Sequence, residues 1–282
     1  MSGRIGIVGH SQFYANGDLD NNNAGFHNSL YRGKNLGNAV SAEQYAQIAA
    51  GTFDDMFVGD YWKITYNNTD RIFRIAAFDY WLRCGDKNWN DGSGASDPYK
   101  LSYDTTHHVV LVPDASLVSA KMNSSNITTG AYIGSGFYTG TNEDESANTA
   151  KATAEGIVSG SFGAAHVLNH RTYLQNAVSN GYESAGAWYD STVDLMNEKM
   201  VYGCDIFHNK MHGTNVPNNY TIDKCQLPLF RLDPSKICIR ASWWLRDVVS
   251  ASNFALVNNY GGATYYNAST SRGVRPAFGI KA

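Results

Sequence analysis

The chain has 282 residues, a net charge of −3 and a charged-residue share of 17%, which is below the roughly 25% usual for soluble domains. Neutral polar residues make up the difference, with 27 Asn and 27 Gly against 6 Pro. The sequence has no basic block, and no apolar run approaches the roughly 18 residues that span a bilayer. We therefore expect no nucleic-acid partner and no membrane insertion.

The first 35 residues contain no hydrophobic period and are dominated by Gly, Asn and Asp. Such a segment is too polar to bury a core alone, yet it contains Phe13, Tyr14, Phe26 and Tyr31, and exposed aromatic side chains usually need cover. We interpret residues 1–35 as an extended N-terminal arm that packs where a partner chain covers it. The sequence thus predicts a homo-oligomer, with a trimer as one form.

The next segment carries the start and stop signals of a short helix. Ser41 suits the N-cap, and Gln44 three residues later completes a capping box. An Ala-rich stretch follows to Ala50, and Gly51 is a typical helix terminator. We predict a helix over residues 41–50.

From Met56 onward the hydrophobic period changes to two. Residues 61–66 and 71–78 are rich in aromatic and β-branched side chains and flank a polar turn at 67–70, which predicts a β-hairpin. A further strand is predicted over residues 107–112, ending at Pro113.

Two segments in the middle of the chain have helical features. Residues 147–180 carry apolar side chains at helical spacing, although Gly156, Gly160 and Gly163 are expected to split the segment. Residues 191–202 form a second predicted helix with an apolar side.

The C-terminal part of the chain returns to a strand pattern. Strands are predicted at 243–245, 255–257, 263–266 and 274–278, with a turn at 258–262. Strands, then helices, then strands indicate an α+β fold rather than a doubly wound sheet. We expect the arm, residues 1–35, to precede one compact domain, residues 36–282.

The four cysteines are Cys84, Cys204, Cys225 and Cys238. None lies in a Cys-x-x-Cys pair, and their spacing matches no zinc finger. We expect buried free thiols, with one bridge among the last three cysteines as the alternative.

One polar segment has part of the pattern of a calcium loop. Asp86, Asn88, Asn90 and Asp97 occupy positions 1, 3, 5 and 12 of such a loop. Asp91 stands where calcium loops need Gly, and position 12 is Asp rather than Glu. We favour a polar surface loop and keep Ca²⁺ as the alternative; no other cofactor is expected.

Two histidine pairs have the spacing that puts both imidazoles on one helix face, His166 with His170 and His208 with His212. No Glu completes the zinc-hydrolase motif and no third ligand stands out, so hydrogen-bonded or surface histidines are the better interpretation. The sequence also lacks nucleophile-elbow, phosphate-loop and dinucleotide motifs, and we predict no catalytic constellation.

Small or apolar residues alternate with polar or aromatic ones in the C-terminal strands. Successive side chains of a strand face opposite ways, so Ala255 and Tyr265 are expected to pack inward. The side chains at the alternate positions, Leu256, Thr264 and Tyr266, are expected to face the solvent. Tyr supplies contact area at low entropic cost and Asn supplies adaptable hydrogen bonds, as in antibody paratopes. An ordinary solvent-facing hairpin is the alternative.

Several short motifs together carry a resemblance. They are HNSLYRGK at 27–34, GDYW at 59–62, HHVV at 107–110, HRT at 170–172, LPLFRL at 227–232, WLRD at 244–247, FA at 254–255, VN at 257–258 and GVRPAF at 273–278. The C-terminal motifs resemble the signature of C-type-lectin-fold proteins of the formylglycine-generating-enzyme type. The set as a whole resembles phage and prophage tail or baseplate proteins of Gram-positive gut bacteria. Some of these are variable proteins, in which a diversity-generating retroelement mutates adenine-containing codons of a ligand-binding face.

The resemblance implies a C-type-lectin-like fold over residues 36–282 and a ligand-binding face within 243–275. Enzymes that share this fold use a reactive cysteine pair, which Cys225 and Cys238 do not reproduce. We therefore expect a non-enzymatic receptor-binding protein of the phage tail. The ligand-binding residues expected are Asn253, Leu256, Asn258, Asn259, Tyr260, Thr264, Tyr266, Asn267, Thr270 and Arg272.

The partners implied are a host cell-surface protein or glycan and other tail proteins. Residues 1–9 have too short an apolar patch for a signal-peptide core, so we expect synthesis in the bacterial cytoplasm and location in the virion. The main alternative is a purely structural tail or baseplate subunit, and a more distant one is an enzyme acting on surface glycan.

Overall fold

The computed structural model describes residues 23–82, 106–123, 125–128, 150–174, 178–179, 182–183, 187–207 and 225–282. The described strands form two five-stranded sheets and two separate strand pairs. The first sheet has the order β1 (Tyr61–Tyr66), β2 (Thr69–Phe78), β3 (Val109–Pro113), β14 (Pro276–Ile280), β9 (Asp194–Leu195). The second sheet has the order β12 (Ala263–Asn267), β11 (Asn253–Val257), β10 (Trp243–Val248), β13 (Arg272–Val274), β4 (Val118–Ala120). The two strand pairs are β5 (His170–Leu174) with β8 (Ala187–Ser191), and β6 (Val178–Ser179) with β7 (Tyr182–Glu183).

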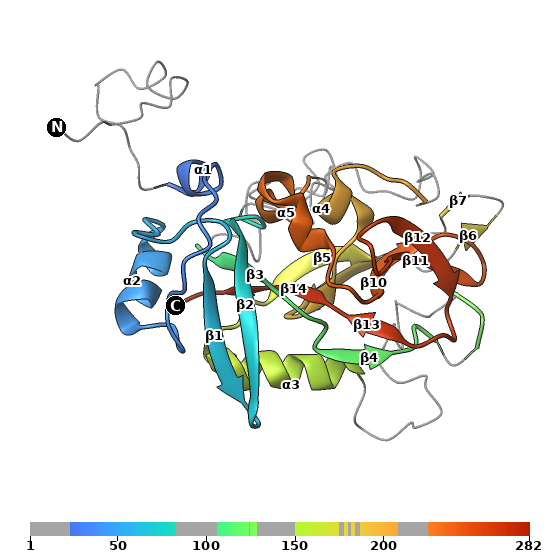
Figure 1. Cartoon of the computed structure of the whole chain (residues 1–282), viewed down its shortest axis with the longest axis horizontal. Helices are drawn as coiled ribbons and strands as arrows, with labels where there is room; N and C mark the ends of the chain where they lie inside the picture. Colours follow the sequence, from blue (N-terminus) through green and yellow to red (C-terminus); the bar gives the residue numbers. More distant parts are fainter. Residues whose placement is uncertain are drawn as a thin grey trace, which may run out of the picture.

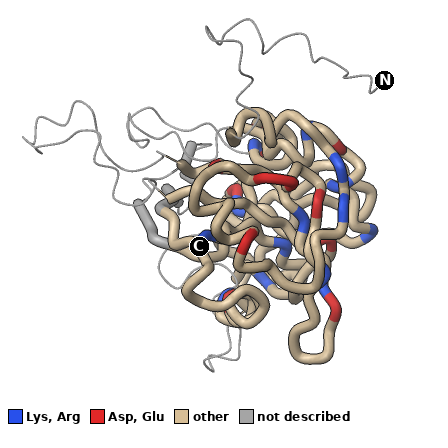
Figure 2. The backbone as a smooth tube through the Cα atoms, turned by 90° about the vertical axis from the view of Figure 1, so that its left-hand side faces the viewer, with Lys and Arg blue, Asp and Glu red and all other residues tan. Residues whose placement is uncertain are grey.

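Short helices surround these sheets, and the α+β class expected from the sequence is confirmed (Figure 1). The α-helices are α1 (Ala24–His27), α2 (Ala42–Ala50), α3 (Ala150–Phe162), α4 (Glu198–Tyr202) and α5 (Pro228–Leu232). Two 3₁₀ turns, η1 (Ala164–His166) and η2 (Pro234–Ile237), follow α3 and α5. Among the described residues, no helix has the length and apolar character needed to cross a bilayer. Acidic and basic residues are interspersed along the described backbone (Figure 2).

Two chain segments cross from one sheet to the other and hold the sheets together. β3 continues into β4, and β13 continues into β14, with antiparallel pairing in both halves. Arg275 lies at the second crossing, fully buried, where its Nε donates to the carbonyl oxygen of Pro113 at 2.8 Å. Its guanidinium lies over the ring of Trp243 at 5.0 Å. Burial lowers the pKa of Arg275 to about 10.

The predicted helix and hairpin at the N-terminal end of the domain are confirmed. Ser41 Oγ accepts from the Gln44 amide at 3.1 Å, while Gln44 Oε1 accepts from the Ser41 amide at 2.9 Å, which completes the capping box of α2. β1 pairs with β2 around a turn in which Asn67 and Asn68 both have positive φ, the conformation that a two-residue hairpin turn requires.

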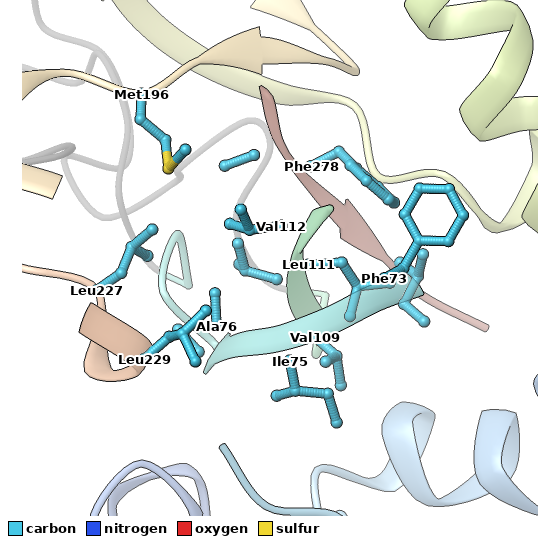
Figure 3. Close-up of a cluster of buried hydrophobic side chains, with 14 of the residues drawn as sticks. Phe73, Ile75, Ala76, Val109, Leu111, Val112, Met196, Leu227, Leu229 and Phe278 are labelled. Atoms are coloured by element: carbon cyan, nitrogen blue, oxygen red, sulfur yellow. The ribbon is translucent and has the colours of Figure 1, made fainter. Parts of the chain in front are cut away.

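The main core lies between the first sheet, the helices and one face of strands β10 and β11 of the second sheet. Phe73 of β2 contacts Phe278 of β14 edge to face, with ring centroids 5.7 Å apart (Figure 3). Phe162 of α3 contacts both rings. Leu229 of α5 packs against the same core. Strands from the first half of the chain, β2 and β3, and the C-terminal strand β14 contribute to one interior. Their Val, Ile and Phe side chains are buried there by the hydrophobic effect.

A second, smaller core lies on the other side of the second sheet. Trp244 of β10 is fully buried there with Phe254, Leu256 and Val274. Its indole N–H donates to the carbonyl oxygen of Ala120 at 2.9 Å, so the large ring is buried without an unmet donor. This cluster positions β11, and β11 in turn positions the outer strand β12.

The two helices predicted in the middle of the chain are shorter than expected. The helix predicted over 147–180 corresponds to α3, which ends at Phe162 because Gly163 has a φ of +85°. Residues 170–174 form strand β5 instead. In the helix predicted over 191–202, only Glu198–Tyr202 is helical; Asn197 caps it by accepting from the Met200 amide at 2.7 Å. A glycine with positive φ ends α3, and a capping side chain sets the start of α4, so these local signals outweigh the apolar periodicity.

Part of the expected N-terminal arm packs on its own chain. His27 is buried, and its Nδ1 donates to the carbonyl oxygen of Met56 at 2.6 Å. Asn28 pairs through its amide group with the backbone of Phe78, at 2.9 and 2.8 Å. The expectation that the arm needs cover from a partner chain is therefore wrong for residues 23–35, and residues 1–22 lie outside the described part of the chain.

Candidate functional site

The candidate ligand-binding residues lie on the outer strand of the second sheet and the segments around it. β12 pairs with β11 on one side, and the strand order places it at the end of the sheet. Tyr260, at the tip of the turn between these strands, has 79% of its surface exposed, and Tyr266 of β12 has 46%. Asn259 and Asn267 are also exposed. We refer to the exposed side chains of β12 and of the 258–262 turn, together with the half-buried Arg272, as the β12 edge.

The turn at the tip of the β12 edge is built by one side chain. Asn258 Oδ1 accepts from the amides of Tyr260 at 2.9 Å and Gly262 at 3.0 Å, and Gly261 has a φ of +90°. Tyr202 of α4 donates its hydroxyl proton to the Gly261 carbonyl oxygen at 3.1 Å. Burial raises the pKa of Tyr202, so this donor keeps its proton at any ordinary pH. Asn258 therefore holds the shape that presents Tyr260.

Leu256 is not a displayed residue. It is 2% exposed and packs with Trp244 and Phe254 in the second core. The alternating pattern of the sequence predicts a hairpin with one core face and one solvent face. Both faces of β11 are buried, because one faces the main core and the other faces the second core.

Tyr265, which we expected to pack inward, is 46% exposed. It lies opposite Ala255 in the register, whereas Tyr266 lies opposite Phe254, so the two tyrosines point to opposite sides of the sheet. Each projects beyond the core that covers β11. The candidate site is thus an edge that exposes both sides of one strand, rather than one flat face.

Arg272 lies beside Tyr266 on the β12 edge. Its guanidinium carbon is 4.6 Å from the centroid of the Tyr266 ring, within the range of a cation–π interaction. The segment between them turns back through a hydrogen bond from the Thr270 amide to the Asn267 carbonyl oxygen at 3.0 Å. Thr264, Thr270 and Asn253 are half-buried, so they border the edge without projecting far from it.

Residues distant in sequence also reach the β12 edge, and the sequence analysis missed them. The ring of Phe207 contacts Tyr265 edge to face, with centroids 5.2 Å apart, and the neighbouring Ile206 is 46% exposed. The buried carboxylate of Glu198 holds this pair by accepting from both of their backbone amides, at 2.8 to 3.1 Å. No local pattern links residue 206 to residue 265, so only the folded chain brings them together.

A second remote segment borders the opposite end of β12. Asn126 Oδ1 accepts from the amide of Ser269 at 3.2 Å, and the Thr128 amide donates to the carbonyl oxygen of Ala251 at 2.9 Å. The adjacent Ile127 is 50% exposed. One large exposed apolar side chain, Ile206, therefore adjoins the Phe207–Tyr265 contact, and another, Ile127, lies in the segment that binds the chain beyond the end of β12.

The predicted metal and histidine features do not converge on this edge. The calcium-loop candidates Asp86, Asn88, Asn90 and Asp97 lie outside the described residues, as do His208 and His212. Within the described part, no group of three His, Cys, Asp or Glu side chains has the geometry to hold a metal ion.

The first histidine pair is not on one helix. His166 belongs to η1 and stacks on Tyr45 with centroids 3.9 Å apart, whereas His170 begins β5 and stacks on Trp81 at 3.8 Å. The i, i+4 spacing does not place the two imidazoles on one helix face, because the 3₁₀ turn η1 ends at His166 and strand β5 begins at His170.

A Lys–Ser contact beside α3 is a structural connection. Lys151 Nζ donates to Ser191 Oγ at 3.0 Å and to the carbonyl oxygen of Val193 at 2.8 Å, and it forms an ion pair with Glu155 at 3.1 Å. The contact joins α3 to the segment before β9.

A half-open pocket of about 330 Å³ lies away from the β12 edge, between residues 69–72 of β2 and residues 113–117 of the β3–β4 connection. The carboxylate of Asp114 on its wall is held by Arg74 at 2.5 Å. This pocket is a separate cavity, with no residue in common with the candidate ligand-binding set.

Two cysteines contradict the expectation of buried thiols. Cys204 and Cys225 are exposed, and Cys238 is half-buried with its Sγ 3.4 Å from the carbonyl oxygen of Asn259. Cys84 lies outside the described residues.

The comparison with known protein families gives one match. Residues 205–282 match a family described as Domain of unknown function (DUF6273). The match covers little more than a quarter of the chain and contains strands β10 to β14, including the whole β12 edge. No curated protein and no solved structure matches the chain.

Proposed function

We propose that this is a non-enzymatic ligand-binding protein whose β12 edge attaches to a molecule on the surface of a host cell. The observation that carries the proposal is the grouping of Tyr260, Tyr265 and Tyr266 on one edge strand and its turn, each at least 46% exposed. Aromatic side chains that project from a rigid sheet bind with little loss of conformational entropy. Arg272 and the exposed Asn259 add polar contacts beside them.

We further propose that the fold is C-type-lectin-like and that the protein belongs to a phage tail. The arrangement of the C-terminal half supports the first point, because the chain builds the sheet that carries β12 and then returns to pair β14 with β3. The resemblance of the WLRD and GVRPAF motifs supports both points. Many copies on one tail would multiply a modest affinity per site.

The ligand would be a host cell-surface protein or glycan, and the tyrosines would be its anchors. In protein interfaces a few residues dominate the binding energy, and Tyr is among the commonest of them. We expect Tyr260→Ala or Tyr266→Ala each to weaken attachment by at least about tenfold, or 1.4 kcal/mol. Neither residue belongs to a buried core, so the fold should be retained.

The test is the binding of fluorescently labelled protein to intact cells of Gram-positive gut bacteria. The matched control is Lys63→Ala, because Lys63 is exposed on the β1–β2 hairpin, which lies at the far end of the molecule from β12 (Figure 1). Circular dichroism monitors folding. Pre-treating the cells with periodate or with protease distinguishes a glycan receptor from a protein receptor.

Two outcomes would reject the proposed site. If Asn253, Tyr260, Tyr265, Tyr266 and Arg272 are all replaced by Ala and the folded protein still binds, the receptor site lies elsewhere. If no cell type retains the wild-type protein and sibling gene copies are uniform at the β12 edge, the structural-subunit alternative is favoured. Sequence variation confined to the exposed positions would instead support diversification by a retroelement, and release of glycan from host walls would favour the enzyme.

A further inference from the structure

The end of α4 lies beside the segment that leads into α5, and Cys204 and Cys225 flank the residues that make this contact. The Leu227 amide donates to the carbonyl oxygen of Met200 at 2.9 Å, and Gln226 Nε2 donates to the carbonyl oxygen of Val201 at 2.9 Å. A Cβ atom placed on Gly203 would lie 3.6 Å from Cβ of Gln226. Disulfide-linked residues have Cβ atoms about 3.5–4.5 Å apart, so this pair of positions already has that spacing.

The two cysteines occupy the next position outward on each segment. Cys204 follows Gly203, and Cys225 precedes Gln226, so each cysteine is the residue next to this closely spaced pair. Both are free thiols on exposed residues, so the bridge would form by oxidation of the folded chain. The sequence left one bridge among the last three cysteines open without indicating which two would form it.

Contacts on both sides hold these cysteines in place. Tyr80 donates its hydroxyl proton to the carbonyl oxygen of Cys225 at 2.6 Å. On the other segment, Lys199 pairs with Asp205 at 2.9 Å, and Glu198 holds the amide of Ile206. Cys238 lies against the 258–262 turn instead, where its Sγ faces the carbonyl oxygen of Asn259.

We propose that Cys204 and Cys225 form a disulfide bond that joins the end of α4 to the segment before α5. The two thiols lose two protons and two electrons and form one S–S bond, while a disulfide oxidant such as oxidised glutathione accepts them and becomes two thiols. Cys204 lies three residues before Phe207, whose ring contacts Tyr265. The disulfide bond therefore fixes the start of the segment that borders the β12 edge.

The experiment oxidises the folded full-length protein with oxidised glutathione and counts its free thiols, followed by peptide mapping without reduction. The chain has four cysteines, so the count should fall from four to two, and one peptide pair should link Cys204 to Cys225. Cys204→Ser and Cys225→Ser should each retain all three remaining thiols. Cys238→Ser is the matched control, and it should form the bridge and retain one free thiol.

Mapping of the wild-type protein requires no variant to fold, so the proposal is testable even if a serine substitution perturbs the structure. A count that stays at four after oxidation would overturn it. So would a map in which Cys204 or Cys225 is linked mainly to Cys238 or Cys84.

Discussion

At the residue scale, His108 shows how one buried side chain makes stability depend on pH. It is fully buried, its Nδ1 donates to the carbonyl oxygen of Thr106 at 2.8 Å, and its Nε2 accepts from the amide of Trp81 at 3.1 Å. This pattern requires the neutral imidazole, because a proton on Nε2 would remove the acceptor. Burial lowers the pKa of His108, although the hydrogen bond to Thr106 and, to a smaller extent, the carboxylate of Asp79 oppose the shift.

The first prediction is that acidification destabilises the protein through His108. Since its pKa is lower in the folded state, the stabilisation is complete above the unfolded pKa of about 6.5 and is lost as the pH falls towards the folded value. The free energy of unfolding should therefore decrease below pH 6.5 by up to about 1.4 kcal/mol per pH unit. Urea unfolding at several pH values between 5 and 7 measures it. His108→Gln should reduce that slope, and identical slopes would contradict the assignment.

The second prediction separates two residues that the sequence alone placed on the same displayed side. Leu256 fills the second core, so Leu256→Ala should cost about 2–5 kcal/mol of unfolding free energy through the cavity it leaves. Tyr266→Ala should cost under about 1 kcal/mol, because the ring is nearly half exposed at the sheet edge. Denaturant titration of both variants tests this. Equal destabilisation would mean that Tyr266 is part of the core after all.

At the element scale, the features that formed as predicted are those whose causes are local. The capping box of α2 involves Ser41 and Gln44, three residues apart, and the Asn67–Asn68 turn closes a hairpin between adjacent strands. The candidate site depends on non-local causes. Leu256 is buried because a second core covers that side of β11, and Phe207 reaches Tyr265 because Glu198 holds its backbone. A period of two along β11 contains no information about either contact.

The third prediction concerns the start of α2. Ser41→Ala removes the side chain that accepts from the Gln44 amide and leaves that amide without its cap. We expect a loss of about 1 kcal/mol in the free energy of unfolding. Ser41→Asp provides the matched comparison, since an aspartate at the N-cap accepts the same hydrogen bond and should restore most of the stability. Thermal unfolding followed by circular dichroism measures both, and an Asp variant as unstable as the Ala variant would exclude capping as the cause.

At the scale of the whole molecule, residues 23–35 connect the N-terminal end of the chain to the first sheet. The carboxylate of Asp60 is fully buried, and it accepts from Arg32 Nη2 at 2.6 Å, from the Lys34 amide at 2.7 Å and from the Phe57 amide at 2.9 Å. Arg32 also bonds to Asp55, so one guanidinium joins two acidic side chains. This network is a reason for the segment to pack on its own chain, whatever assembly the protein forms.

The last prediction compares two truncations. Removing residues 1–35 deletes Arg32 and Lys34 and leaves Asp60 with a buried charge that lacks its partner, which typically costs about 3–5 kcal/mol. Removing residues 1–22 keeps every contact described above, so this variant serves as the control. Arg32→Ala isolates the ion pair from the rest of the segment.

Urea unfolding should show a large loss of unfolding free energy for the longer deletion and for Arg32→Ala. Light scattering on the same samples tests the homo-oligomer expected from the sequence. If the protein without residues 1–35 is as stable as the full chain, the segment does not stabilise the first sheet. If the full chain and both truncated proteins are monomers at micromolar concentration, the arm does not assemble the protein.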